Sequence, residues 1–270
     1  MSEHALLTAT ELSFRIGERT LVDGISLSVE PGALHVVVGS NGAGKSTLLR
    51  ILCGELSPTQ GRVAYGTEAV ADIPAWRLAG LRAVLPQSAR LAFPFSVAEV
   101  ARIGLDGIGH GLSRGDRATI LSDALRHADM LHLAERAYQS LSGGEQARVQ
   151  FARVLCQLAA GRTVTQRQVL FLDEPTASLD LRHQSAILET VHTLCRGGVG
   201  VVAILHDLNL AAAYADRLLV LDGGRLVAEG RPAEILRDDL IAAVFGVDWP
   251  VGRTPPTGQP FILPRKVVAS

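Results

Sequence analysis

Lysine, cysteine and aromatic residues are scarce in this sequence of 270 residues, and neither sign of charge dominates. Only Lys45 and Lys266 are lysines, and the 26 Lys and Arg residues nearly balance the 27 Asp and Glu residues, which leaves a net charge of −1. A chain without excess positive charge is not expected to bind nucleic acid. The three cysteines, Cys53, Cys156 and Cys195, form no CxxC pair. They indicate neither a disulfide framework nor a zinc site, and they fit a reducing compartment.

Long hydrophobic runs are also absent. The longest apolar runs, such as residues 199–205, are far shorter than the roughly 20 residues that cross a bilayer. The first residues lack the positive charge and the apolar stretch of a secretory signal. With 47% apolar and 20% charged residues, the composition is that of a globular protein. We therefore expect any role at a membrane to depend on a partner.

Strand patterns dominate the first part of the chain. Short alternating segments over residues 5–38 predict a β-rich opening that is interrupted at Gly17, at Gly24 and at Pro31–Gly32. The pattern becomes helical over residues 45–52. The order is therefore strand, glycine-rich loop and helix.

Helical and strand patterns share the rest of the chain. Residues 96–160 carry long helical patterns, which predict a helical insertion. Strand patterns then alternate with helices predicted over residues 181–196 and 208–215, as is typical of βαβ units around a buried parallel sheet. Residues 249–264 are rich in proline and glycine and predict an irregular tail with one short strand.

The glycine-rich loop fits the pattern GxxxxGK[ST]. Its residues are Gly39, Ser40, Asn41, Gly42, Ala43, Gly44, Lys45 and Ser46, and Thr47 follows. Glycines let backbone N–H groups point at phosphate oxygens, and the helix N-terminus adds the positive end of its dipole. We expect Lys45 to reach the β- and γ-phosphates and the Ser46 hydroxyl to ligate Mg²⁺. The segment therefore predicts a site for a nucleoside triphosphate.

Two adjacent carboxylates end an apolar strand pattern. Asp173 and Glu174 follow residues 169–172, which places them at the carboxyl end of the sheet, beside the phosphate-binding loop. Asp173 is expected to hold Mg²⁺, directly or through water, and Glu174 to polarise the water that attacks the γ-phosphate. A strand that ends in Asp-Glu is also common as a solvated strand end, but the preceding phosphate-binding loop favours the catalytic interpretation.

Five motifs follow one another along nearly the whole chain. They are the phosphate-binding loop, Gln87, the LSGGEQ segment of residues 141–146, the DEPTASLD segment of residues 173–180, and His206 after an apolar strand. In these motifs and their order, the chain resembles the ATP-binding subunits of ABC transporters. The resemblance implies an α/β fold in which a P-loop NTPase (RecA-like) core carries an N-terminal antiparallel β subdomain and an inserted α-helical subdomain.

The resemblance also implies boundaries between these parts. Residues 1–87 would form the β subdomain and the first part of the ATPase core. Residues 88–160 would form the helical subdomain, which ends in the helix of the LSGGE signature. Residues 161–248 would complete the core, and residues 249–270 would form the irregular tail.

A hydrolytic site for ATP is implied within one chain. The implied catalytic residues are Glu174, His206 and Gln87, and the implied ligands of Mg²⁺ are Ser46, Gln87 and Asp173. Without the other motifs, Gln87 would be an ordinary loop residue and His206 an ordinary residue at a strand end.

The resemblance further implies that two copies share each ATP. The signature residues Ser142, Gly143, Gly144 and Glu145 would form a second anion-binding helix start for the ATP held by the other copy. Asp180 would couple the two sites across this homodimer, with a helix N-cap as its alternative role. Two separate transmembrane permease subunits are implied as further partners. The chain would then be a peripheral protein at the cytoplasmic face of the bacterial inner membrane.

Four short segments of the sequence indicate which cargo the resemblance implies. Residues 76–97, 159–168, 179–184 and 244–251 resemble the haem-importer ATPases of the iron-siderophore and cobalamin import group. Haem (hemin) import is therefore implied, with a periplasmic haem-binding protein as an indirect partner. Import of a ferric siderophore or of cobalamin is the alternative. A soluble ABC-type ATPase of DNA repair or translation is a further alternative, but the sequence has neither the second ATPase unit nor the coiled-coil insertion typical of those proteins.

Two features limit what this chain itself is expected to bind. The eight histidines are scattered and form no CxxCH motif, so we expect no direct contact with haem and no metal besides Mg²⁺. Ile16 aligns with the position where an aromatic ring commonly stacks on adenine in the family. Packing of Ile16 or of the Arg15 guanidinium could replace that ring, and we therefore expect GTP to be hydrolysed as well as ATP.

Overall fold

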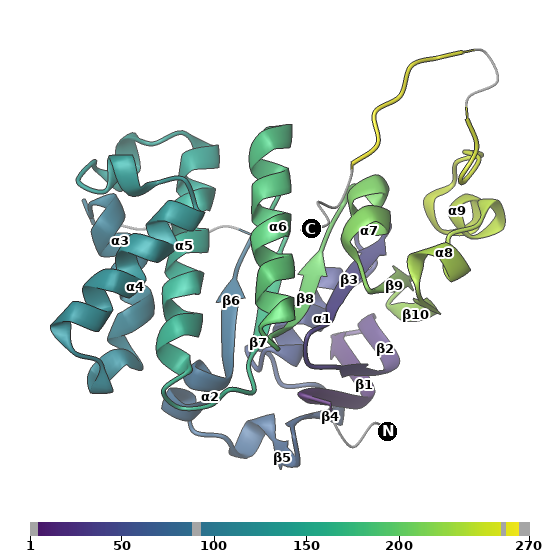
Figure 1. Cartoon of the computed structure of the whole chain (residues 1–270). Coiled ribbons are helices and arrows are strands. Elements are labelled where there is room, and N and C mark those ends of the chain that lie inside the picture. Colours follow the sequence, from purple (N-terminus) through teal and green to yellow (C-terminus); the bar gives the residue numbers. More distant parts are fainter. Residues whose placement is uncertain (1–4, 88–92, 255–257, 265–270) are drawn as a thin grey trace.

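A central sheet of parallel strands organises the computed structural model, which describes residues 5–87, 93–254 and 258–264 (Figure 1). The six-stranded sheet has the order β10-β9-β3-β8-β7-β6, and only β10 runs antiparallel to its neighbour. Its strands are β3 (Leu34–Gly39), β6 (Arg82–Leu85), β7 (Val169–Asp173), β8 (Gly200–Ile204), β9 (Arg217–Asp222) and β10 (Arg225–Gly230). The parallel sheet expected from the alternation of strands and helices is confirmed.

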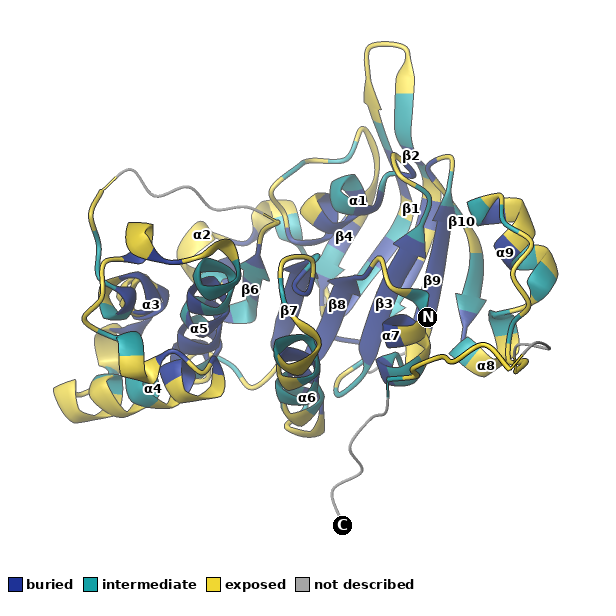
Figure 2. Ribbon diagram, turned by 90° about the horizontal axis from the view of Figure 1, so that it is seen from above, coloured by how far each residue is buried: buried dark blue, intermediate teal, exposed yellow. Residues whose placement is uncertain are grey.

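Both faces of this sheet are buried because its strands are apolar at nearly every position. Successive side chains of a strand point to opposite faces. In β7, Leu170 and Leu172 pack into one hydrophobic core, whereas Val169 and Phe171 pack into a second core on the other face. The other parallel strands follow the same alternation, so the sheet is buried between two layers (Figure 2).

Helices cover one face of the sheet, and a helix together with a second sheet covers the other. Figure 2 shows α6 (Leu181–Arg196) and α7 (Leu208–Tyr214) on one side. On the opposite side lie α1 (Lys45–Leu52) and the antiparallel sheet. The helix expected over residues 181–196 has those bounds, and the helix expected over 208–215 ends one residue earlier.

The antiparallel sheet contains the first strands of the chain. Its order is β2-β1-β4-β5, and its strands are β1 (Leu7–Ile16), β2 (Arg19–Val29), β4 (Gln60–Tyr65) and β5 (Glu68–Ala69). The expected interruptions at Gly17 and at Pro31–Gly32 are confirmed. The expected interruption at Gly24 is wrong, because β2 continues through it. Gly24 has a φ of 65° and donates its N–H to the hydroxyl of Ser13 at 3.0 Å, at an irregularity in the pairing with β1.

Helices gather beside β6, at one end of the central sheet. They are α3 (Val97–Asp106), α4 (Arg114–His127) and α5 (Gly143–Gly161), and they pack against one another (Figures 1 and 2). Each begins at a serine that caps the helix together with an acidic residue three positions later. Gly104 allows α3 to approach α5, since a Cβ at this position would lie 2.0 Å from the carbonyl oxygen of Arg153.

Several shorter elements complete the chain. The remaining helices are α2 (Ala75–Leu81), α8 (Pro232–Ile235) and α9 (Asp238–Phe245), and the 3₁₀ turns are η1 (Val70–Asp72), η2 (Gly109–Gly111), η3 (Leu131–Leu133) and η4 (Tyr138–Ser140). The short strand expected in the tail is absent from its described residues, 249–254 and 258–264. Within the described ranges, no helix combines the length and apolar character needed to span a membrane.

A hydrogen bond between a buried histidine and a partly exposed glutamate fixes the start of the central strand β3. His35 is 1% exposed, and its Nε2 lies 2.7 Å from a carboxylate oxygen of Glu30, which follows β2. The other carboxylate oxygen of Glu30 accepts a hydrogen bond of 2.6 Å from Ser28. The hydrogen bond to His35 is the main cause that lowers the pKa of Glu30 from 4.5 to about 2, although burial opposes it. The pair therefore joins the antiparallel sheet to the central sheet.

We expect Glu30→Gln to destabilise the folded chain by about 1 kcal/mol at neutral pH, a value reduced for the partial exposure of the carboxylate. A carboxyl group whose pKa is lower in the folded state stabilises that state above its unfolded pKa, and this contribution declines as the pH falls toward the folded pKa. The difference in unfolding free energy between the two proteins should therefore shrink as the pH falls below about 4.5. Urea unfolding across this range measures it. The substitution Glu55→Gln, at an exposed position, is the control. An equal loss of unfolding free energy in both variants, independent of pH, would contradict the expectation.

Candidate active site

The phosphate-binding loop connects the carboxyl end of β3 to the start of α1. Gly39, Gly42 and Gly44 all have positive φ angles, of 152°, 80° and 96°. A Cβ at Gly39 would lie 2.0 Å from the carbonyl oxygen of Leu221, and one at Gly44 would lie 2.1 Å from that of Leu21. Glycine is therefore required by close backbone approach at two positions, and by backbone conformation at all three.

Hydrogen bonds within the chain hold the remaining residues of this loop. The N–H of Ala43 donates to the carbonyl of Ser40 at 3.2 Å, and the carbonyl of Ala43 accepts from Gly224 at 3.2 Å. Asn41 is exposed at the tip of the loop, and Thr47 lies in the first turn of α1. The loop thus has a fixed inner side and an accessible tip.

The ammonium group of Lys45 is held over this loop. Lys45 is only 7% exposed, and its Nζ donates to the carbonyls of Gly39 and Ser40, both at 2.9 Å. Because an ammonium group has three N–H bonds, one remains for an anionic ligand. Burial lowers the pKa of Lys45, whereas the carboxylates of Glu174 and Asp173 act in the opposite direction. A phosphate would compensate the buried positive charge.

Asp173 and Ser46 face each other beside the lysine. Asp173 ends β7 and is 7% exposed, and it accepts a hydrogen bond of 3.2 Å from the hydroxyl of Ser46. Burial is the main cause that raises the pKa of Asp173, with the neighbouring Glu174 acting in the same direction. A nearly buried carboxylate beside a hydroxyl is an oxygen donor set that suits Mg²⁺, which takes one or two carboxylates and completes its shell with water and phosphate oxygens.

Glu174 lies between the two side chains that the sequence analysis grouped with it. Its Oε2 accepts a hydrogen bond of 2.9 Å from Gln87, and its Oε1 lies 2.5 Å from Nε2 of His206. Its side chain is 13% exposed, and its backbone has a φ of 54°, a conformation that residues with a Cβ rarely adopt. The structure therefore brings Gln87, Glu174 and His206 together at the carboxyl ends of β6, β7 and β8.

The signature residues lie apart from this group. Ser142 caps α5, and its N–H donates a hydrogen bond of 2.7 Å to the carboxylate of Glu145. A Cβ at Gly144 would lie 2.9 Å from the carbonyl oxygen of Ser178, so glycine lets α5 start close to the segment before α6. In the described part of the chain, no hydrogen bond or ion pair joins the segment from Ser142 through Gly143 to Glu145 with the phosphate-binding loop.

Asp180 is the N-cap of α6. It caps α6 by accepting a hydrogen bond of 2.9 Å from the N–H of His183, and the same oxygen lies 2.8 Å from Nδ1 of that histidine. Nε2 of His183 in turn lies 3.5 Å from a carboxylate oxygen of Asp129, in the turn after α4. Asp180 is therefore linked to the helices beside β6.

The site's geometry agrees with the comparison to known families. Residues 22–177 match the family described as ABC transporter, and this range includes the phosphate-binding loop, the signature residues and Glu174. The chain belongs to the ABC transporter family. As an ATP-binding subunit of this family, it binds nucleotide and hydrolyses ATP.

Curated relatives match this ABC ATPase over nearly its whole length. The hemin import ATP-binding protein HmuV of Rhodopseudomonas palustris is 48% identical over 96% of this chain and 94% of the relative. The protein of the same name from Pseudomonas aeruginosa is 46% identical over 96% of this chain and 100% of the relative.

Solved structures agree on the fold. An ATP-binding cassette of an ABC transporter is similar with a TM-score of 0.76 and 25% identity, and the match covers 90% of this chain and 98% of that one. Another cassette, solved as a dimer in a post-hydrolysis state with ADP and Pi, gives a TM-score of 0.72 at 23% identity, covering 84% of this chain and 98% of that one. The P-loop NTPase fold expected from the sequence is confirmed.

One contact of the ABC site was missed by the sequence analysis. The hydroxyl of Ser40 donates to Asp222 at 3.2 Å, and Asp222 ends β9, the strand beside β3. The apolar strand pattern before Asp222 resembles the one before Asp173, so the repeat of a strand ending in aspartate was an available signal. Ile16, which aligns with the adenine-stacking position of the family, is 62% exposed at the end of β1.

We expect Gly44→Ala to destabilise the chain more than Gly42→Ala does. Both positions have positive φ, which costs a residue with a Cβ about 1–2 kcal/mol. Only the Cβ at Gly44 would also collide with backbone, so its total cost should be about 2–5 kcal/mol, whereas nothing lies within 4 Å of a Cβ at Gly42. Urea unfolding of both variants measures the difference in their unfolding free energy. Equal losses of unfolding free energy would show that the collision of the new Cβ with Leu21 adds no cost.

Proposed function

We propose that this chain is the ATP-hydrolysing, energy-coupling subunit of an ABC importer for hemin. The observation that carries the proposal is the similarity, over nearly the full chain, to relatives named as hemin import ATP-binding proteins, and the contacts of Glu174 with Gln87 and His206 support it. A ferric siderophore or cobalamin is the alternative cargo. The permease, rather than this chain, would contact the cargo.

Glu174 is the general base in this proposal. Its carboxylate takes a proton from the attacking water, and the oxygen of that water bonds to the γ-phosphorus. The bond between the γ-phosphorus and the β-phosphate oxygen breaks, which releases ADP. Gln87 and His206 hold the carboxylate from two sides, so that its free lone pairs face the water. Lys45 and the N–H groups of the loop bind the phosphates, and the helix dipole of α1 adds positive potential.

Ser46, Asp173 and Gln87 would hold Mg²⁺. The pairing of Ser46 with a nearly buried Asp173 supports this assignment, because a buried carboxylate needs a positive charge or a hydrogen bond. When bound, Mg²⁺ neutralises charge on the β- and γ-phosphates. The three residues would supply a hydroxyl oxygen, a carboxylate and an amide oxygen, the last because Gln87 donates to Glu174 through its nitrogen.

A homodimer would complete each site. Ser142, Gly143, Gly144 and Glu145 would bind the ATP held by the partner copy, and Asp180 would couple the two sites. Their separation from the phosphate-binding loop within one chain supports this arrangement, as does the dimeric state of a solved relative of the same fold. In this role, α3, α4 and α5 belong to the helical subdomain of residues 88–160.

The remaining partners follow from the importer function. Two transmembrane permease subunits would bind the chain at the cytoplasmic face of the inner membrane. A periplasmic haem-binding protein would deliver the cargo to them. Closure of the dimer on two ATP molecules would move the permease subunits, and hydrolysis would reset them.

We expect Glu174→Gln to lower the ATP turnover by about 10²–10⁴-fold and to leave ATP affinity nearly unchanged, because glutamine keeps the shape but cannot accept the proton. Steady-state phosphate release and equilibrium binding of ATP measure the two effects. Glu55→Gln, on the surface outside the site, is the matched control. Turnover within a few-fold of the wild type in Glu174→Gln would remove Glu174 from its role as base.

The cargo is tested in lipid with the permease subunits present. We expect the ATPase rate of the complex to rise when hemin-loaded periplasmic binding protein is added, and this rise to vanish in Glu174→Gln. Stimulation by a siderophore or cobalamin instead would keep the importer function and change the cargo. Hydrolysis that no permease or binding protein alters would contradict the importer function.

A further inference from the structure

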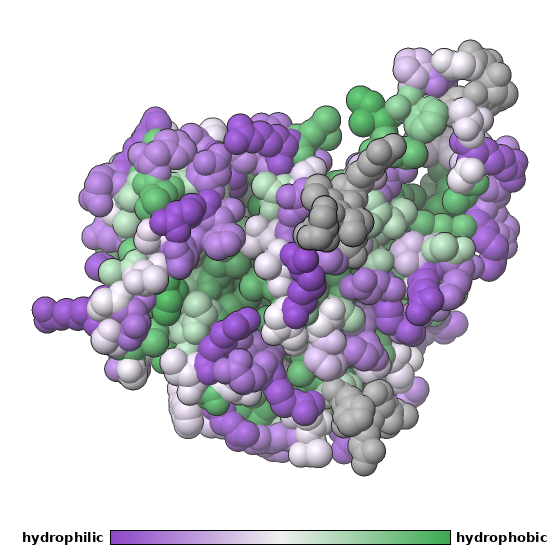
Figure 3. Space-filling model, in the orientation of Figure 1, coloured by the Kyte–Doolittle hydropathy of each residue, from purple (hydrophilic) through white to green (hydrophobic). Residues whose placement is uncertain are grey.

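A cavity lies at the boundary between the helices beside β6 and the helices that cover the central sheet. It has a volume of about 320 Å³ and is lined by residues of α4, of α5 and of α6, and by Val199 before β8. Figure 3 shows hydrophobic side chains gathered in a hollow of the surface between α5 and α6. The cavity is remote from the residues proposed for ATP hydrolysis, none of which lines it.

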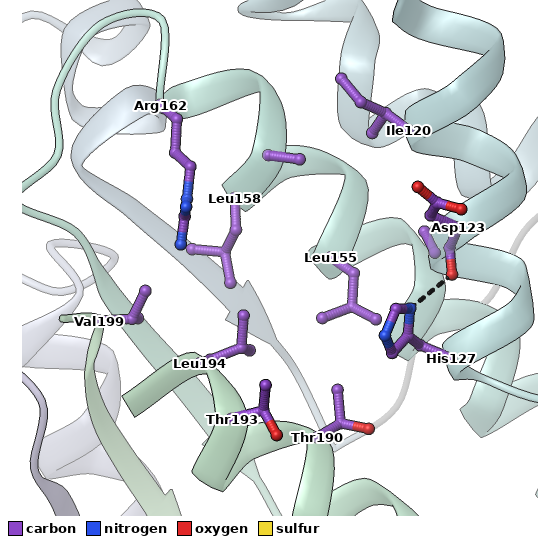
Figure 4. Close-up of a pocket in the computed structure, with 12 residues that line it drawn as sticks. Ile120, Asp123, His127, Leu155, Leu158, Arg162, Thr190, Thr193, Leu194 and Val199 are labelled. Carbon is purple, nitrogen blue, oxygen red and sulfur yellow. Dashed lines mark hydrogen bonds between the residues drawn. The ribbon is translucent and has the colours of Figure 1, made fainter. Parts of the chain in front are cut away.

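The floor of this cavity is apolar and well buried. Leu155 and Leu158 of α5 are 8% and 3% exposed, and Leu194 of α6 lies opposite them beside Val199, which is 1% exposed (Figure 4). An apolar floor with a few polar groups at the rim is the usual composition of a small-molecule site. The floor therefore favours a ligand with an apolar body.

One unpaired charge stands at the rim. Arg162, at the end of α5, extends beside Leu158 and Leu194 (Figure 4). In the ranges that the structure describes, its guanidinium group makes no hydrogen bond or ion pair, although it offers five N–H donors. A guanidinium group matches the geometry of a carboxylate. The rim therefore favours a ligand that carries an anionic group.

The opposite end of the cavity carries no unpaired charge. Asp123 forms an ion pair with Arg126. Nδ1 of His127 lies 2.8 Å from the backbone carbonyl of Asp123 and must donate to it, because a carbonyl oxygen can only accept (Figure 4). The hydroxyls of Thr190 and Thr193 donate to carbonyls of their own helix. Charge complementarity thus places the anionic group of a ligand at Arg162 and its apolar body toward Leu155.

The volume limits the size of the ligand. An apolar cavity of about 150 Å³ accommodates benzene. The cavity at 320 Å³ is about twice as large, which corresponds to a ligand of about a dozen non-hydrogen atoms. A medium-chain carboxylic acid has this size, whereas a porphyrin does not.

We propose that this cavity binds a small amphipathic carboxylate, with its acid group on Arg162 and its apolar chain on Leu155, Leu158 and Val199. Such a ligand would contact α4 and α5 on one side and α6 on the other. It would therefore bridge the two groups of helices, at a place that no residue of the ATP site occupies.

Calorimetric titration of the full chain with octanoate tests the proposal, and 1-octanol serves as the uncharged comparison ligand. We expect saturable binding of octanoate with a Kd at or below about 1 mM, and binding of octanol at least about fivefold weaker. Arg162→Gln should weaken octanoate binding by about tenfold and leave octanol binding unchanged. Ala159→Leu, which fills the cavity, should remove binding of both ligands.

Arg102→Gln, an exposed arginine of α3 outside the cavity, is the matched control and should bind like the wild type. The ATPase rate and the thermal unfolding of each variant report whether it is folded. Octanol binding as tightly as octanoate to the wild-type chain would overturn the proposal, and this comparison needs no variant. Octanoate binding that survives Ala159→Leu unchanged would also overturn it, because the ligand would then lie elsewhere.

Discussion

The parallel pairing of three strands is the constraint on which the active site depends. Val37 of β3 and Asp173 of β7 both pair with Ile204 of β8, so β7 and β8 end level with one another, and β3 continues for two more residues to Gly39. Glu174 follows the end of β7 by one residue, and His206 follows the end of β8 by two. Their contact is therefore a result of register. A shift of one residue in any of these strands would also exchange its two buried faces, so the two hydrophobic cores and the residues proposed for hydrolysis depend on the same hydrogen bonds.

Two opposite charges are buried beside this edge, and neither is favourable there alone. Burial lowers the pKa of Lys45 and raises the pKa of Asp173, so burial destabilises the charged form of each side chain. The chain partly compensates them with the carbonyls of Gly39 and Ser40 and with the hydroxyl of Ser46. A phosphate oxygen beside Lys45 and a cation beside Asp173 would compensate these charges further. Substrate binding and the relief of buried charge are thus one event.

The sequence predicted the parts of the fold that have a strong period or a fixed motif. The helix over residues 181–196 was predicted with its bounds, and the glycine-rich loop was predicted in its place between a strand and a helix, because each depends on local chemistry. Gly24 was misjudged because its positive φ produces an irregular strand rather than a turn. No individual strand or helix was predicted over residues 55–86, where β4, β5, α2 and β6 are short and where β4 and β6 pair with strands far along the chain. Asp222 was missed because its contact with Ser40 depends on which strands are neighbours. That order is a property of the whole sheet.

The left-handed backbone of Glu174 has a consequence for the evolution and engineering of this protein. Glutamate at a φ of 54° is less favourable than glycine by about 1 kcal/mol, and this cost is present whether or not ATP is hydrolysed. Selection for thermal stability alone would therefore replace Glu174, and a search for stabilising substitutions would find glycine or asparagine at this position. Such variants would be more stable, and with the role proposed for Glu174 they would no longer hydrolyse ATP. The φ angle of Glu174 therefore lowers the stability of the protein in favour of the chemistry proposed for its side chain.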